Sequence, residues 1–242
     1  MDTQIDSQSS LAFCPTLAHM VATGQAIGRS GARVSAPGLS SNNSLLILRN
    51  LQRTLRPART IEIGFGFGAS SLVFMQTHKD LGHPPGKRHV SIDPFARDWD
   101  ECGIVAVEKA GLIEWLDFRA EFSCLELPRL VAAGDRFDLA YIDGSHLFED
   151  AFIDIYYVAR LLNIGGVVVF DDSSTKDVQK VIRFIRANWA DGLKELDLVE
   201  YRPDKGKSLK YQVARQLGRT QLTAFTKIAD VGRPANSSLR NF

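Results

Sequence analysis

Short, uninterrupted apolar runs alternate along the chain with longer segments in which apolar residues recur at helical spacing. Five of these runs predict strands, one that ends at residue 63 and others at 89–92, 116–119, 137–142 and 167–170. The run from Val167 to Phe170 contains no polar residue, as is typical of a strand buried on both faces. Two more runs, at 196–201 and 222–228, predict a sixth and a seventh strand.

Between these runs, apolar residues recur every three or four positions, as they do on the buried face of a helix. Helices are predicted directly after the strand that ends at residue 63 and at residues 44–55, about 99–110, 148–162 and 178–189. Strands that alternate with helices predict a parallel sheet with helices on both faces. The sequence therefore predicts an α/β fold, a Rossmann-like, doubly wound, mostly parallel seven-stranded sheet.

The domain organisation follows from where this alternation begins and ends. Residues 1–43 are rich in Ser, Gly, Ala and Gln and predict an N-terminal extension or cap with one short helix and flexible connectors. Residues 44–232 form the predicted main domain, and residues 233–242 form a tail. A basic segment, 202–219, is expected to be a loop between the last two strands, and a solvated loop, a lid or a dimer contact are all open.

The amino-acid composition argues against several classes of protein. The 242 residues carry a formal net charge of +1, which argues against a general nucleic-acid or membrane-surface binder. The three cysteines are widely spaced and form no metal-type pair, so a reducing compartment is expected. The first ten residues lack the basic start of a signal peptide, and no apolar run reaches 18 residues. We therefore expect a soluble cytoplasmic protein that uses a small molecule, with a homo-oligomer possible.

The stretch TIEIGFGFGASSL, residues 60–72, places three glycines between a strand and a helix. Gly64, Gly66 and Gly68 can adopt turn conformations closed to other residues, and the first turn of a helix offers free backbone N–H groups. Such a loop lets the backbone approach a ligand closely. We interpret it as the binding loop of a nucleotide-type cofactor.

Polar residues follow the other predicted strands at the point where each one ends. Asp93, Glu121, Asp143 and the pair Asp171-Asp172 occupy these positions. In parallel α/β sheets the carboxyl ends of the strands form the ligand-binding edge. We therefore expect these side chains and the glycines to line one cleft.

The glycine loop alone leaves two cofactors open. Gly64, Gly66 and Ala69 satisfy the dinucleotide pattern G-x-G-x-x-(G/A), which would make the chain an NAD(P)-dependent oxidoreductase. Against this alternative, neither Tyr156 nor Tyr157 is followed four residues later by the lysine expected of a short-chain dehydrogenase. A third interpretation is a non-catalytic nucleotide-binding protein that has kept the pocket and lost the chemistry.

The run from Glu62 to Gly68 resembles motif I of class I S-adenosylmethionine (SAM) dependent methyltransferases. The segment from Asp143 to Asp172, with IDG-x-H, an Asp, LL-x-x-GG and a final DD, resembles the core of the branch related to macrocin-type and catechol-type O-methyltransferases. The resemblance covers about residues 43–190. It implies a SAM-dependent methyltransferase that methylates a hydroxyl group of a small molecule such as a sugar, a phenol or a natural product.

The resemblance also assigns roles to the cofactor site. It implies that Glu62 orients the loop or meets the ammonium group of SAM, and that Asp93 accepts the ribose hydroxyls, which suits a carboxylate. The adenine would lie beside Glu121 and Phe122. The predicted cofactor-binding residues are Glu62, Gly64, Gly66, Gly68, Ser70, Asp93, Glu121, Phe122 and Asp143.

Asp143 and His146 are the predicted catalytic residues. The resemblance places Asp143 over the transferred methyl group, and a histidine can take the proton of an acceptor hydroxyl near neutral pH. Adjacent carboxylates repel each other unless a cation lies between them, so Asp143, Asp171 and Asp172 are candidate ligands for Mg²⁺. Asp172 departs from the Asp-Asn expected of catechol-type relatives, which leaves the metal open.

Overall fold

The computed structural model describes residues 11–233 and 235–242. The beginning of the predicted N-terminal extension, residues 1–10, and position 234 of the predicted tail lie outside the described residues. No helix in the described part of the chain is long and apolar enough to cross a membrane.

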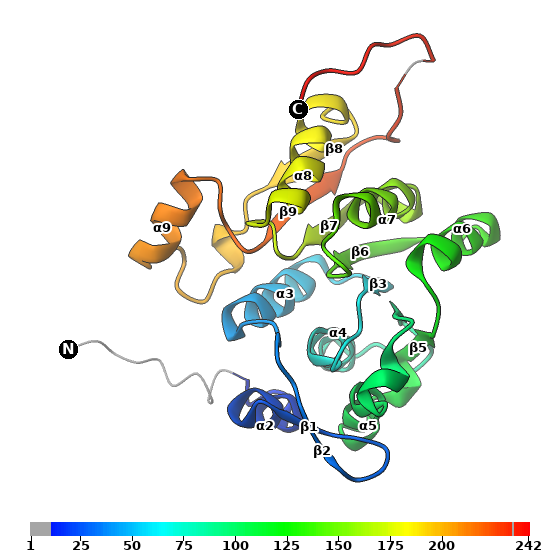
Figure 1. The fold of residues 1–242 in the computed structure, drawn as a ribbon, viewed down its shortest axis with the longest axis vertical. Coiled ribbons are helices and arrows are strands. Elements are labelled where there is room, and N and C mark those ends of the chain that lie inside the picture. The colour runs from blue at the N-terminus through cyan, green and yellow to red at the C-terminus, as the bar shows by residue number, and fades with distance from the viewer. Residues whose placement is uncertain (1–10, 234) are drawn as a thin grey trace.

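A seven-stranded sheet forms the centre of the molecule, with strand order β5-β4-β3-β6-β7-β9-β8 (Figure 1). The strands from β5 to β7 pair in parallel, and β9 runs antiparallel to both of its neighbours. The bounds are β3 Thr60–Ile63, β4 His89–Ile92, β5 Leu116–Arg119, β6 Phe137–Ile142, β7 Leu162–Phe170, β8 Leu193–Leu196 and β9 Thr223–Lys227. The predicted fold class is confirmed.

Successive residues of the central strands enter two separate cores. Leu139 and Tyr141 of β6 pack in the core that contains α3, α4 and α5, whereas Ala140 and Ile142 pack in the core that contains α7 and α8. This division follows from the period of two along a strand. The covering helices are α3 Asn42–Leu55, α4 Ala69–Asp80 and α5 Cys102–Lys109 on one face, and α6 Ser123–Ala133, α7 Phe148–Leu161 and α8 Lys176–Asn188 on the other (Figure 1).

The segment before α3 contains more regular structure than its composition predicts. Helix α2 Pro15–Thr23 is followed by a two-stranded antiparallel hairpin of β1 Gln25–Ile27 and β2 Arg33–Ser35. The hairpin was not predicted, because strands of three residues carry no periodicity that can be recognised. Buried residues of this segment, including Leu17 and Met20, join the core beneath α3 and α4.

Three other predictions are wrong in their details. Helix α6 was not predicted, and the helix expected from about residue 99 begins at Cys102, after a 3₁₀ turn at Ala96–Trp99. Helix α7 passes directly into β7 at Leu162, five residues before the predicted strand. The pairing of β6 with β7 explains this early start, since Phe137 is already opposite Leu162.

The C-terminal part also differs from the prediction. The strand expected at 196–201 ends at Leu196, because the Asp197 carboxylate accepts a hydrogen bond from the Val199 N–H at 3.0 Å and turns the chain into a 3₁₀ helix, Val199–Tyr201. The segment 202–219, predicted to be a loop, contains α9 Leu209–Gln216. The Arg202 guanidinium lies 3.7 Å from the ring centre of Tyr211 and connects this helix to the turn before it.

Candidate active site

The glycine loop lies where the strand order reverses, between β3 and β6, which is the ligand-binding edge of an open α/β sheet. Gly64 follows β3 with φ +92°, and a Cβ built on it would lie 2.0 Å from the backbone oxygen of Asp143. Only glycine fits at such an approach. Gly66, with φ +48°, faces open space, and Gly68, with φ +80°, precedes the first turn of α4.

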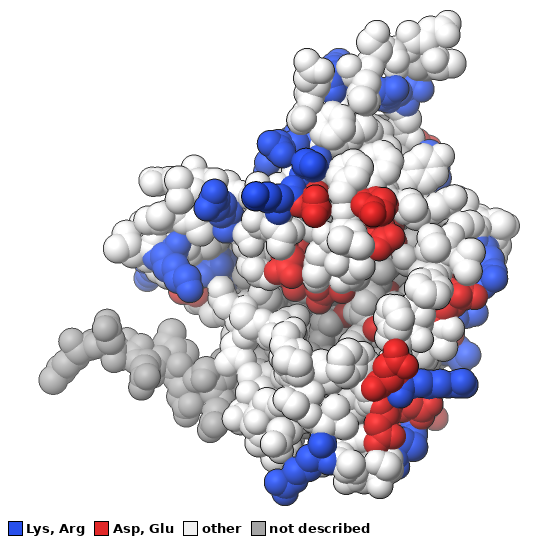
Figure 2. Space-filling model, viewed as in Figure 1, with Lys and Arg blue, Asp and Glu red and all other residues white. Residues whose placement is uncertain are grey.

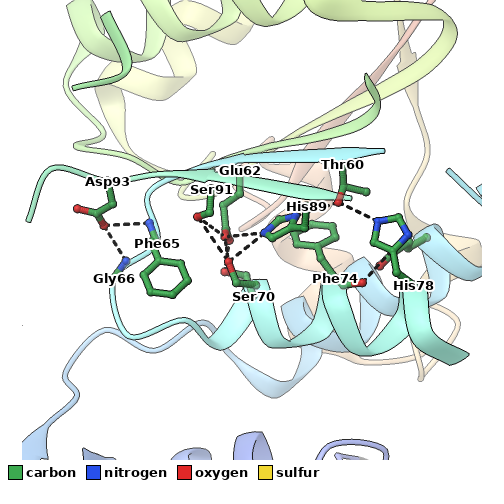
Figure 3. Close-up of polar contacts among 12 residues, drawn as sticks. Thr60, Glu62, Phe65, Gly66, Ser70, Phe74, His78, His89, Ser91 and Asp93 are labelled. Atoms are coloured by element: carbon green, nitrogen blue, oxygen red, sulfur yellow. Dashed lines mark hydrogen bonds and ion pairs between the residues drawn. The ribbon is translucent and has the colours of Figure 1, made fainter. Parts of the chain in front are cut away.

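Asp93 holds the glycine loop in shape. Its Oδ2 accepts hydrogen bonds from the backbone N–H groups of Phe65 at 2.9 Å and Gly66 at 2.8 Å (Figure 3). Its Oδ1 accepts one from the backbone N–H of Phe95 at 2.7 Å. The side chain is nearly buried, yet it reaches the wall of the cavity described below. Asp93 therefore positions the loop and borders the cavity at the same time.

Glu62 lies beneath the loop rather than in the cavity. The fully buried carboxylate accepts hydrogen bonds from the hydroxyls of Ser70 and Ser71, in the first turn of α4, and from Ser91 at 3.1 Å (Figure 3). His89 Nε2 lies 3.3 Å from Glu62 Oε2. Of the two predicted roles, this arrangement supports orientation of the loop; Ser70 is the partner that also lines the cavity.

A cavity of about 440 Å³ opens over the glycine loop and extends along the ends of β3, β4 and β6. Predicted site residues in its wall are Gly64, Gly66, Ser70, Asp93, Phe122, Asp143 and His146. Its volume lies within the ordinary range for small-molecule and cofactor sites. Asp and Glu side chains gather around a hollow near the middle of the face shown in Figure 2, and basic side chains lie over α8 and α9.

The other predicted site residues, Glu62, Gly68, Glu121, Asp171 and Asp172, are not in the wall of this cavity. Glu121 accepts a hydrogen bond from the Phe122 N–H and pairs with Arg129 at 3.3 Å. Phe122 is half-exposed and contacts Phe95 edge to face, with ring centres 5.8 Å apart. Two exposed aromatic rings at a cavity rim provide an apolar surface for a flat ligand group.

His146 lies between two carboxylates. Its Nε2 is 3.2 Å from Asp172 Oδ2 and 3.7 Å from Asp143 Oδ1. Both His146, at φ +60°, and Asp172, at φ +45°, have left-handed backbone conformations, which are uncommon outside glycine and cluster at functional sites. The structure thus brings together residues from the ends of β6 and β7.

The two aspartates after β7 differ in their surroundings. Asp171 is buried, and its carboxylate accepts hydrogen bonds from the Tyr141 hydroxyl at 2.6 Å and from Gln221 Nε2 at 2.9 Å. The same Gln221 nitrogen donates to Asp172 Oδ1 at 2.6 Å. A side-chain amide and a phenol therefore relieve the repulsion that was expected to attract a cation.

The predicted Mg²⁺ ligand set of Asp143, Asp171 and Asp172 does not fit. Within the described residues, no group of three or more His, Cys, Asp or Glu side chains is arranged to hold a metal ion. The physical reason is the hydrogen bonding of the two aspartates after β7 to Tyr141, Gln221 and His146. No step of the chemistry proposed below is routed through a metal.

Burial changes the proton affinity of three acidic groups near the cavity. The pKa of Asp143 is raised well above its usual value, first by burial and then by the charges of Asp171, Glu62 and Asp172. Burial likewise raises the pKa of Tyr141. Burial raises the pKa of Asp154, on α7, to about 7. Perturbed groups of this kind concentrate at functional sites.

Several residues in the cavity wall were not among the predicted site residues. They include Leu39 and Ser40 from the segment before α3, Phe95 after β4, Ser123 and Cys124 at the start of α6, and Asp154. Asp154 is the aspartate in the middle of the family pattern, but no role was predicted for it. For the remainder, the sequence offered no spacing signal, because loops that are distant along the chain carry them.

The fold and the site together define a class of protein. A parallel sheet with an antiparallel last strand, a three-glycine loop after β3 and an aspartate after β4 are the features of class I SAM-dependent methyltransferases. Residues 61–173 match the family model described as a methyltransferase domain, and this segment contains the glycine loop, Asp93, Asp143 and the Asp171-Asp172 pair. Over this segment the chain is similar to the methyltransferase domain family.

Several solved structures share this fold. The chain is similar to cofactor-bound Rv0187 from MTB, with 20% identity, a TM-score of 0.62 and 93% of each chain covered. It is also similar to the O-methyltransferase TomG from Streptomyces achromogenes, solved with SAM, with 18% identity, a TM-score of 0.61 and coverage of 94% of this chain and 92% of that one.

A third similar structure is an O-methyltransferase from Bacillus cereus in complex with SAH, the demethylated product of SAM, with 16% identity, a TM-score of 0.60 and coverage of 93% and 94%. At these identities the likeness shows the fold. No curated protein matches the chain in sequence.

Proposed function

We propose that the chain transfers the methyl group of SAM to a hydroxyl oxygen of a small-molecule acceptor. The observation that carries this proposal is the pairing of His146 with Asp172 at 3.2 Å, next to a cavity built on a glycine loop. Two of the similar structures are named O-methyltransferases, which supports oxygen as the methyl acceptor.

The residues of the cavity fit the cofactor. Gly64 and Gly66 give the backbone close access to the methionine part, and the Phe95 and Phe122 rings would contact the adenine. A carboxylate has about four acceptor positions, and backbone N–H groups occupy three of those on Asp93. We therefore expect Asp93 to accept one ribose hydroxyl rather than both. Glu62 and Gly68 would act indirectly, through the loop that they support.

When bound, SAM supplies a methyl group that an oxygen nucleophile can take by in-line displacement of the sulfonium sulfur, which leaves as SAH. The chain then has to align the acceptor and remove its proton. If His146 Nε2–H donates to Asp172, the lone pair on Nδ1 can accept the hydroxyl proton. The nearby carboxylate of Asp172 would stabilise the resulting imidazolium, as in other base–carboxylate pairs.

The segment before α3 would complete the site as a cap. Pro37, Gly38, Leu39 and Ser40 lie in the cavity wall opposite the strand ends. Connecting segments of this kind carry substrate recognition in many α/β enzymes. We propose that the described part of the extension, residues 11–43, covers the cofactor and contributes to acceptor binding.

Calorimetric titration with SAH, and separately with NADH, tests the cofactor. Binding of SAH and not NADH is expected, and the reverse would contradict the assignment. Turnover is then measured as SAH release from SAM with a panel of phenols, sugars and hydroxylated natural products. We expect a hydroxyl acceptor to be methylated by the wild type and at most weakly by His146→Gln. A chain that binds SAH but methylates only amines or thiols would overturn oxygen transfer.

A further inference from the structure

A continuous chain of buried polar side chains leads from Glu62 beneath the glycine loop to the surface at His83. His89 Nε2 lies 3.3 Å from Glu62 Oε2, and His89 Nδ1 lies 2.9 Å from Thr60 Oγ1. Thr60 Oγ1 lies 3.1 Å from His78 Nε2, and His78 Nδ1 lies 2.9 Å from His83 Nδ1. Figure 3 shows most of this chain between β3, β4 and α4.

The interior of this chain is shielded from the solvent. Glu62, His89, Thr60 and His78 are fully buried, and the Phe74 ring stacks on His89 with ring centres 5.0 Å apart. His83 is the partly exposed end. The methyl-transfer mechanism proposed above uses none of the three histidines. Buried polar groups in such numbers are costly unless all of them are hydrogen-bonded.

The contacts allow every hydrogen bond to point toward Glu62. His83 Nδ1–H can donate to His78, His78 Nε2–H to Thr60, the Thr60 hydroxyl to His89 Nδ1, and His89 Nε2–H to Glu62. Each neutral histidine then has one donor and one acceptor nitrogen, as the neutral ring requires. Burial lowers the pKa of His78 to about 3, which keeps that ring neutral.

The same contacts also allow every hydrogen bond to point the other way. A proton that arrives on His83 Nε2 releases the Nδ1 proton to His78, which passes its Nε2 proton to Thr60, and so on until His89 or Glu62 has gained one proton. No heavy atom has to move, and no proton is lost or gained apart from the one that enters. The net charge of the Glu62–His89 pair changes from −1 to 0.

We propose that this chain is a proton path that sets the charge of the Glu62–His89 pair beneath the cofactor loop. Ser70 donates to Glu62 and also lines the cavity, so the pair is one side chain removed from the ligand. The inference rests on the proposed use of SAM, which carries a sulfonium charge that SAH lacks. A negative pair favours the cationic cofactor, and a neutral pair favours it less.

Other charged groups face both ends of the path. Arg56 and Arg88 lie near His83 and disfavour its protonation, since together with burial they lower its pKa. Asp143 faces the inner end and senses the charge of Glu62, which contributes to its raised pKa. The serines around Glu62 stabilise its charged form through hydrogen bonds. The positive charges of the arginines therefore disfavour the entry of a proton at His83, whereas the carboxylates at the inner end attract it.

Long-range ¹H–¹⁵N NMR of the full chain can read the tautomers of His78, His83 and His89 across pH. We expect the three rings to change together at one midpoint, and this midpoint to be lower with SAM bound than with SAH bound. At pH values below the midpoint, the ratio of SAM affinity to SAH affinity should then decrease as the pH falls. The decrease can reach about tenfold per pH unit, which is the limit for one linked proton.

Variants test whether the histidines titrate together, as a connected path requires, or independently. Thr60→Val removes the central link with little change in volume, so His83 and His89 should titrate independently. The glutamine of His83→Gln can still donate a hydrogen bond to His78 but cannot accept a proton from the solvent. This variant is the second test of the path if the Thr60 variant does not fold. His19→Gln, on the exposed face of α2, is the matched control and should behave as the wild type.

Two results would overturn the proposed path. One is a pair of tautomers in which His78 and His89 both donate to Thr60, and the other is a tautomer change with the same midpoint pH in the presence of SAM and of SAH. A chain that binds neither ligand would contradict the proposed function instead, while the tautomers of the free protein would still test the path.

Discussion

Gly64 approaches the backbone of Asp143 so closely that a Cβ on Gly64 would lie 2.0 Å from the Asp143 carbonyl oxygen. The end of β3 and the end of β6 are thereby held against each other, and the cavity opens directly above them. The glycine at this position is required by two separate conditions, the contact and a φ of +92°.

Replacement of Gly64 by alanine should separate the two strand ends. We expect destabilisation of at least about 1–3 kcal/mol from the backbone strain alone, together with loss of measurable SAH binding. Gly24→Ala is the matched control, because Gly24 also has a positive φ but no atom within 4 Å of its Cβ position. Urea unfolding and calorimetry measure both effects, and SAH binding by a folded Gly64→Ala protein would contradict the close contact.

His146→Gln should lower kcat by about 10²–10⁴-fold, the usual contribution of a general base, while SAH affinity stays within a factor of a few. Asp172→Asn should lower kcat by less, because the histidine is kept and the imidazolium loses only a carboxylate partner. Steady-state kinetics across pH measure both. Unchanged kcat in His146→Gln would assign the proton transfer to another group.

Chelation should leave turnover unchanged. The Asp171 carboxylate is hydrogen-bonded to Tyr141 and Gln221, and Asp172 to Gln221 and His146, so the predicted metal ligands are already engaged. Initial rates are compared before and after treatment with EDTA, with added Mg²⁺ as the reversal. A loss of rate that Mg²⁺ restores would show that a cation displaces these hydrogen bonds in the presence of the acceptor.

Asp154 should make the protein less stable as the pH rises toward neutral. Its pKa is about 7 in the fold, against 3.8 for the free side chain, so the unfolded chain loses this proton first. The stabilisation is therefore complete below about pH 3.8 and is lost as the pH rises through 7, by up to about 4 kcal/mol.

Asp154→Asn keeps the shape of the neutral carboxyl group and cannot ionise. We expect this variant to lose that part of the pH dependence between pH 4.5 and pH 7.5, as measured by the free energy of unfolding in urea. Asp191→Asn, at an exposed position, is the control and should follow the wild type. An Asp154→Asn protein with the wild-type pH dependence would show that the carboxyl group is already ionised in the fold.

The order of most strands and helices could be predicted because those elements carry their own signal. The apolar run of β7 and the helical spacing of α7 are local properties, and so is the glycine loop, whose conformation depends on residues without a side chain. The same holds for Asp93 and Asp143, which follow their strands directly. Local periodicity together with strand-end position was enough to predict the fold class and part of the cavity wall, including Asp93 and Asp143.

The tertiary structure decided which of these residues meet. Glu121 and Glu62 have the charge expected of ligand contacts, but Arg129 pairs with the first and buried serines surround the second. The carboxylates of Asp171 and Asp172, which were predicted to share a metal ion, accept hydrogen bonds from Gln221, a residue 49 positions from Asp172. Such pairings depend on the packing of distant segments, whereas the sequence by itself determines only what each residue is able to do.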